Sequence, residues 1–302
     1  MAVMTRFDFA KELEEGLNTV FGMEYDDYPV EYTQVFNVES SKKAYEEDVL
    51  LTGFGYASEK AEGDAFAEDA GKEGWTKRYT HRTVGLSFLV TEEAVEDQLY
   101  MQLGPKYAKA LARSIAQTVE VYAANVLNYA VTAGYTGGDG QVLLSANHPT
   151  IGAGVQSNLI ATTDFGETAL ESALTLIRKM KDDRGLPIMA KALRVIGPPD
   201  LQWVIRKTME TASTPFSADN TKNVVRDAIS TEAAILTNLT DADAWFVKTD
   251  VMDGLKFFDR TSTVVPKATV DPSTGNIRYR ARKRFSEGFS DWRGVVGSQG
   301  AG

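Results

Sequence analysis

The clearest structural pattern in the chain is PKYAKALARSIAQTVEVYAANVLNYAVTA, residues 105–133. Apolar side chains recur in it at steps of three and four, the spacing of one helix face: Tyr107, Leu111, Ile115, Val119, Tyr122, Val126, Tyr129 and Ala133. Pro105 is favourable in the first turn of a helix, and Gly134 is favourable just after its last turn. A helix of this length is a rod of roughly 43 Å, longer than most helices of globular proteins. It predicts an elongated or flattened body.

The segment after this helix, GYTGGDGQVLLSANHPT (134–150), concentrates glycines. A phosphate-binding loop needs its glycines before a helix, with Lys-Ser or Lys-Thr following, and a dinucleotide fold needs the same strand-to-helix order. Here the glycines follow a helix, so we predict a turn in which Gly137, Gly138 and Gly140 supply positive φ. His148 lies three residues after Ser145, which does not establish a catalytic pair, and we predict structural hydrogen bonds for its ring.

The segment before the helix has a different composition. Residues 53–80 are rich in Gly, Ala, Glu and Lys and poor in large apolar residues, whereas 75–91 alternate like a strand. We predict a long two-stranded loop that projects from the body, with Trp75 and Tyr79 as anchors and His81 in the projecting strand. An isolated hairpin is marginal in water, so this one needs a surface to lie on.

The remaining elements are shorter. Residues 1–37 predict a helix followed by an extended arm, which includes YPVEYTQVFNV. A helix over 165–183 follows the Asp164–Glu167 capping-box spacing and buries Leu170, Leu174, Ile177 and Met180. The other predicted elements are a buried strand at 192–199, a helix at 200–211, and short strands near 224–229, 244–248, 255–258 and 276–285.

The amino-acid composition limits the classes of protein to which the chain can belong. The 302 residues are 43% hydrophobic and 25% charged, enough for one large domain or two of ordinary size. No apolar run is long enough for a membrane span, and the absence of cysteine excludes disulfides and thiolate sites and fits a reducing compartment. The net charge of −10 disfavours general nucleic-acid binding.

Few residues indicate chemistry. Two histidines without cysteine do not make a typical zinc site. The close carboxylates of DDRG (182–185) and DADAWF (241–246) lack calcium-loop spacing and predict solvated turns. No catalytic, cofactor or metal residue is therefore predicted.

A charge pattern remains. Arg278, Arg280 and Arg282 alternate on a predicted strand and share one face. This row could bind an acidic arm, bind nucleic acid, or form a solvated face. We favour the first interpretation, with the acidic run Glu46, Glu47 and Asp48 as its inter-subunit partner.

This order of segments resembles the major capsid proteins of tailed phages, which have the HK-ninety-seven fold, and within them the Mu-like major head subunit family. The resemblance covers nearly the whole chain. Its best-matching segments are 63–97, similar to the family's extended-loop hairpin, 105–133, similar to its spine helix, 137–149, 182–188 and 291–298.

The resemblance implies an α+β phage capsid fold. It divides the chain into an N-terminal arm (1–52), an extended loop (53–90), a peripheral domain (91–190) with the spine helix, an axial domain (191–270), and C-terminal strands that return to the peripheral domain (271–302). In this fold the arm and loop reach neighbouring subunits, and 134–150 is a hook that turns the chain back across the peripheral domain.

The implied function is self-assembly into pentamers and hexamers of an icosahedral head around double-stranded DNA, which the acidic shell touches weakly and without specificity. The protein would be part of the virion, assemble in the host cytoplasm, and work with a portal, a decoration protein and a separate scaffolding protein, or none. No motif identifies the lysine–asparagine crosslink of some relatives. Candidate inter-subunit contacts in the loop are Trp75, Lys77, Arg78 and Tyr79. The alternatives are an encapsulin-like compartment around cargo enzymes and a cytoplasmic enzyme of unknown chemistry.

Overall fold

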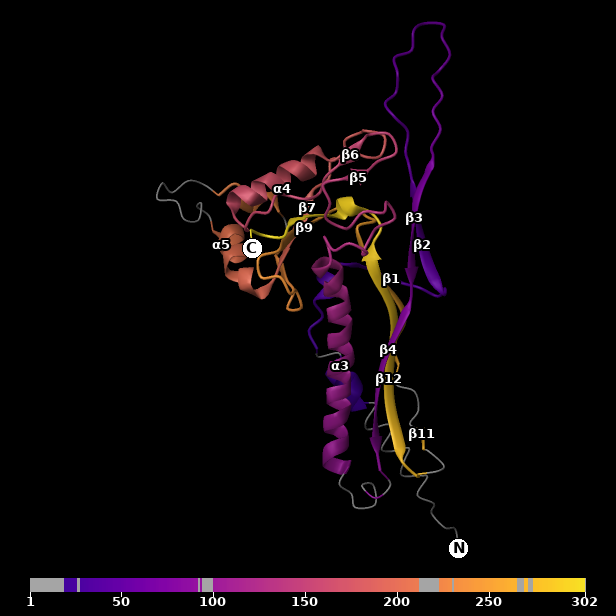
Figure 1. Ribbon diagram of the computed structural model, residues 1–302, viewed down its shortest axis with the longest axis vertical. Coiled ribbons are helices and arrows are strands. Elements are labelled where there is room, and N and C mark those ends of the chain that lie inside the picture. Colours follow the sequence, from indigo (N-terminus) through magenta and orange to yellow (C-terminus); the bar gives the residue numbers. More distant parts are fainter. Residues whose placement is uncertain are drawn as a thin grey trace.

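The computed structural model is elongated. A long helix stands beside long strands, a second group of helices and strands lies to one side, and a hairpin projects beyond both (Figure 1). No helix in the part of the chain that the structure describes is long and apolar enough to cross a membrane. The structure describes residues 19–25, 28–91, 93, 100–211, 223–229, 231–264, 269–270 and 274–301. Residues 19–25 are helical, as predicted for the N-terminal segment, and the rest of the predicted N-terminal helix lies outside the described residues.

The long helix α3 spans Tyr100–Asn128. It begins and ends earlier than predicted, so Pro105 lies inside it rather than in its first turn. The C-terminal difference has a local cause: the amide of Ala130 bonds to the carbonyl of Leu127, a tighter pairing than the α-helical one. Gly134, with φ of 99°, then reverses the chain after this turn instead of capping the helix.

The larger sheet packs against α3 and is built around β12. Its strand order is β1–β10–β12–β11, and β4 also pairs with β12, antiparallel. Its strands are β1 (Asn37–Ser40), β4 (Arg82–Val90), β10 (Leu255–Val264), β11 (Thr269–Val270) and β12 (Ile277–Phe289). Alternate β12 residues, such as Tyr279, Ala281 and Phe285, are buried. Burying such side chains stabilises the pairing by about 1.5–3 kcal/mol for each large one.

The apolar stripe of α3 covers this sheet. Its first half, including Leu111 and Ile115, packs with Tyr279 and Ala281. Its second half joins the main core through Val119, Ala123 and Leu127, which cluster with Phe257, Phe285 and Phe289. The periodicity that predicted the helix therefore also predicted its buried face.

The projecting hairpin consists of β2 (Tyr45–Leu51) and β3 (Glu73–Thr80), which pair antiparallel. Between them the chain runs through residues 52–72 without regular secondary structure, as its composition predicted (Figure 1). His81 does not project. It is buried between β3 and β4, and its two ring nitrogens lie 3.0 Å from the hydroxyls of Ser41 and Ser286.

The second group is a four-stranded sheet in the order β13–β9–β7–β8, with two helices packed on it. Its strands are β7 (Ala192–Gly197), β8 (Ala234–Ile235), β9 (Trp245–Thr249) and β13 (Val295–Ser298), and its helices are α4 (Glu167–Lys179) and α5 (Gln202–Glu210). The predicted inward residues Leu170, Ile177 and Met180 are buried, and so is Ile205 on α5. A short pair, β5 (His148–Pro149) and β6 (Val155–Gln156), lies beside the hairpin (Figure 1).

Three local predictions were wrong. The cap of α4 is Gly166, with no side-chain hydrogen bond, so the Asp164–Glu167 capping box does not form. The strand predicted near 224–229 is the 3₁₀ turn Val225–Ala228, and the predicted extended arm contains the 3₁₀ turn Tyr32–Gln34. The remaining 3₁₀ turns are Pro199–Leu201, before α5, and Trp292–Gly294, before β13.

Candidate assembly surfaces

The base of the hairpin is fixed to its own subunit by side chains of β3. Tyr79 is buried, its ring packs edge-on against Phe258 at 5.0 Å between centroids, and its hydroxyl bonds to Ser290. Lys77 donates to the carbonyl oxygen of Thr136 at 2.5 Å, and burial lowers the pKa of its ammonium. These two candidate inter-subunit residues therefore anchor the hairpin within one chain.

The glycines after α3 allow the hairpin base to approach closely. A Cβ on Gly138 would lie 3.1 Å from Cδ1 of Trp75, and one on Gly137 would lie 2.6 Å from the ring of Phe289. Neither glycine has a positive φ, whereas Gly140 has φ of 77°. The predicted positive φ is thus confirmed at Gly140 and wrong at Gly137 and Gly138, where the absence of a side chain is what matters.

The acidic run on β2 finds its cations in the same chain. The contacts are Glu46 to Lys43 at 3.1 Å, Glu47 to Arg78 at 2.7 Å, and Asp48 to Lys256 at 2.8 Å. Two candidate residues, Glu47 and Arg78, are thus brought together, but as partners within one subunit. An exposed pair of this kind contributes only about 0 to 1 kcal/mol.

The basic row, Arg278, Arg280 and Arg282, is exposed along one face of β12, as the alternation predicted. The residues paired with the row on β4 are Leu89, Ser87 and Gly85, all exposed. Within the described ranges no ion pair joins the row to a carboxylate. The structure therefore places Glu46, Glu47 and Asp48 in contacts of their own and leaves the basic row open to another molecule.

A bidentate ion pair holds the hairpin farther out. Nη2 of Arg184 lies 2.7 Å from both carboxylate oxygens of Asp69, and the amide of Gly55 donates to the same carboxylate at 2.8 Å. The bond from Gly55 and then the Arg184 guanidinium lower the pKa of Asp69. No sequence pattern predicted this contact, because Asp69 and Arg184 are 115 positions apart in the chain.

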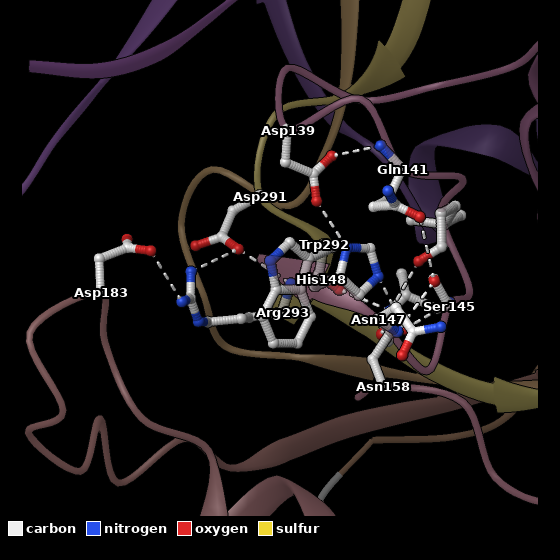
Figure 2. Close-up of polar contacts among 12 residues, drawn as sticks. Asp139, Gln141, Ser145, Asn147, His148, Asn158, Asp183, Asp291, Trp292 and Arg293 are labelled. Atoms are coloured by element: carbon white, nitrogen blue, oxygen red, sulfur yellow. Dashed lines mark hydrogen bonds and ion pairs between the residues drawn. The ribbon is translucent and has the colours of Figure 1, made fainter. Parts of the chain in front are cut away.

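The turn after α3 contains a buried polar cluster around His148 (Figure 2). Nδ1 of His148 lies 2.6 Å from Asp139, Nε2 lies 3.1 Å from the side-chain oxygen of Asn158, and the ring stacks on Trp292 at 4.3 Å. Both ring nitrogens are therefore engaged, which confirms structural hydrogen bonding for His148. The Ser145 hydroxyl accepts from a backbone amide and also contacts Gln141, but makes no bond to His148.

Arg293 extends this cluster on the other side of Trp292 (Figure 2). Its guanidinium lies 4.5 Å from the indole centroid, and 3.3 Å from both Asp183 and Asp291. Its Nε donates to the carbonyl of Lys181 at 2.9 Å. The prediction of a solvated turn at DDRG is thus wrong for Asp183, which is buried and whose charge is balanced by Arg293. No pattern in the sequence indicates that these two residues are in contact.

Two buried carboxylates lie where elements join. Glu120 on α3 accepts the backbone amides of Glu31 and Tyr32 at 2.9 and 3.0 Å, and so ties that segment to the helix. Glu287 on β12 pairs with Arg82 at 2.8 Å, and its Oε2 has no hydrogen-bond partner. Burial raises the pKa of each carboxyl to about 7.

These clusters hold segments of the chain together. In the described residues no group of three His, Asp or Glu side chains is arranged to hold a metal ion. The exposed surfaces of the described residues include the hairpin beyond Asp69 and the basic row.

The fold is shared with proteins that form shells. Over 94% of this chain and 98% of the other, the structure is similar to a virus-like particle from Pyrococcus furiosus, with a TM-score of 0.55 and 9% identity. It is also similar to the capsid of a native GTA particle (TM-score 0.54, 13% identity, 90% of each chain). A third similar structure is the capsid of the myovirus XM1 (TM-score 0.51, 12% identity, 90% of this chain and 92% of that one). These likenesses define the class, an α+β subunit with the fold of tailed-phage capsid proteins.

Sequence comparison identifies the family. The family model described as phage capsid protein matches residues 73–298, so the chain belongs to that family. It is a structural protein of the phage head shell, and its place is the capsid of the virion. A search of curated protein sequences gives no match.

Proposed function

We propose that this capsid protein assembles into pentamers and hexamers that close an icosahedral head around double-stranded DNA. The family match over residues 73–298 is the observation that carries the proposal. The hairpin supports it, because residues 52–72 are mostly exposed and project beyond the body, where they add little to the subunit's own core (Figure 1).

We propose a separate role in assembly for each segment of the chain. The arm (1–52) and extended loop (53–90) contact neighbouring subunits, the peripheral domain (91–190) carries α3, the axial domain (191–270) meets its copies at five- and six-fold centres, and 271–302 return to the peripheral domain. The long pairing of β12 with β4 supports this return for residues 277–289, which it brings to the strands beside α3, whereas β13 pairs with β9 in the second sheet.

Assembly in the host cytoplasm with a portal, a decoration protein and a scaffolding protein would complete the head. The net charge of −10 fits weak, non-specific contact with packaged DNA, because like charges keep the wall from binding phosphates tightly.

Electron microscopy of the protein, expressed with and without its neighbouring phage genes, tests the proposal. Closed shells with five- and six-fold clusters are expected, and shells from infected cells should protect DNA from nuclease. A strict monomer at all concentrations and salts, even with those genes supplied, would contradict it. Shells filled with an enzyme instead of DNA would identify a cargo compartment.

A further inference from the structure

A cleft lies where the base of the hairpin, the end of α3 and the end of β12 meet (Figure 1). Its volume is about 550 Å³, within the range of clefts that hold small molecules. Its lining comes from β3, from α3 and the turn after it, and from β12. Because packed side chains hold these three elements against one another, the cleft is a preformed feature of the subunit.

The lining of the cleft is positively charged, although the chain as a whole is acidic. Three cations line it, Lys77, Arg78 and Arg82, and one carboxylate, Glu287. Arg78 pairs with Glu47, and Arg82 pairs with Glu287. The charge that remains in the cleft is therefore that of Lys77.

Lys77 has no charged partner. In the described part of the chain its ammonium donates to the carbonyl of Thr136 and lies 5.7 Å from the ring centroid of Phe289, with no carboxylate at ion-pair distance. The charge of Asp139 raises the pKa of Lys77, but burial lowers it more, and that carboxylate is bonded to His148. A partly buried ammonium without a counter-charge is costly, and an anion in the cleft would reduce the cost.

Aromatic rings are the second feature of the lining. Tyr129 and Tyr135 both line the cleft and stack on each other with 4.4 Å between ring centroids. Tyr135 is 56% exposed, so part of its ring is free for another molecule. Tyr122 lies 4.6 Å from the guanidinium of Arg82. Aromatic faces beside cations are the means by which proteins hold nucleobases and phosphates without sequence preference.

Glu287 supplies a hydrogen-bond acceptor. Its Oε1 pairs with Arg82 at 2.8 Å, whereas its Oε2 is buried without a hydrogen-bond partner. Nucleobases carry amine groups on their edges, and carboxylates accept hydrogen bonds from them. A nucleoside phosphate combines an anion, a planar ring and a donor on the ring edge, and so matches all three features of the cleft. An acidic peptide supplies the anion alone.

We propose that this cleft binds a nucleoside phosphate, with the phosphate at Lys77 and Arg82 and the base against Tyr135. The proposal goes beyond shell formation and does not rest on it, so binding is measured on the unassembled subunit. The same ligand chemistry has two sources, free nucleotides and a single strand of DNA, which the experiment distinguishes.

Titration calorimetry of the full-length subunit with deoxyadenosine monophosphate tests the site. Saturable binding of one nucleotide per chain is expected. Inorganic phosphate and deoxyadenosine should each bind at least about tenfold more weakly, because the first lacks the stacking ring and the second lacks the charge.

Two variants test the residues. Lys77→Gln removes the charge and keeps a donor for the Thr136 carbonyl, and Tyr135→Leu removes the ring at an exposed position. Each should weaken nucleotide binding by at least about tenfold. Arg178→Gln, at an exposed position of α4, is the matched control and should bind like wild type. If Lys77→Gln loses its fold by circular dichroism, Tyr135→Leu decides.

The outcomes are distinct. Absence of saturable binding, or equal affinity in wild type and Tyr135→Leu, overturns the proposal, and so does displacement of the nucleotide by an equal concentration of a glutamate peptide. A short single-stranded oligodeoxyadenylate that binds more tightly than the monophosphate supports the site and identifies DNA as its source, whereas weaker or equal binding identifies the free nucleotide. Shells that form from a chain without nucleotide binding overturn this proposal alone.

Discussion

At the scale of single residues, Arg293 is the position where substitution should cost most. Arg293→Met leaves Asp183 and Asp291 near each other without their shared cation. Breaking a buried ion pair on one side costs about 3–5 kcal/mol, so the melting temperature should fall by roughly 5–15 °C. Calorimetry on the unassembled subunit measures this, with the exposed Arg226→Met as the control expected to stay near wild type. Equal melting temperatures for the two variants would show that the cluster contributes little.

The same cluster of residues shows which contacts could not be predicted from the sequence. His148 was correctly predicted to be structural, because no partner for catalysis could be named. Its actual partners, Asp139 and Asn158, were not predicted, since a hydrogen bond between a turn and a later strand leaves no periodic trace. Arg293 and Arg184 were missed for the same reason: each meets a carboxylate more than 100 positions away.

At the scale of elements, the hairpin should be separable from folding. Deleting 57–73 removes almost only exposed residues and the Asp69 contact, but keeps the anchor Tyr79. We expect a soluble, folded subunit that fails to close shells, because the core clusters contain no residue of the deleted segment.

Circular dichroism and electron microscopy of the deletion check both halves of this prediction. Arg184→Ala is the milder comparison, since it releases Asp69 and keeps the whole tip. An unfolded deletion product would mean that the segment supports the core, and normal shells would mean that assembly does not need it.

Elements with local signals were the ones the sequence predicted well. The period of α3 and the alternation of β3 and β4 are properties of neighbouring residues, so all three elements were found. Strand pairing is non-local, and so the partnership of β4 with β12 was not predicted. The C-terminal end of α3 differs from the prediction because a tight turn, rather than Gly134, sets its limit.

At the scale of the whole molecule, stability should fall as pH rises from about 5 to 7.5. Burial raises the pKa of the Glu120 and Glu287 carboxyls from 4.5 to about 7. Between those values the folded chain therefore binds more protons than the unfolded chain, and the free energy of unfolding decreases with pH, on the order of 1–3 kcal/mol in total. Below this window the sign reverses, because hydrogen bonds from Gly55 and Ser41 lower the pKa of Asp69 and Glu46, respectively, and acid removes that contribution.

Urea unfolding of the unassembled subunit across this range measures the curve, which should have its maximum near pH 5. Glu287→Gln keeps the shape of the side chain and removes its titration, so it should flatten the decline between about pH 5 and 7.5. Glu68→Gln, at an exposed position of the hairpin tip, should leave the slope unchanged. If the Glu287→Gln curve keeps the wild-type slope, the buried carboxyl at the junction of β12 and Arg82 is not the source of the pH dependence.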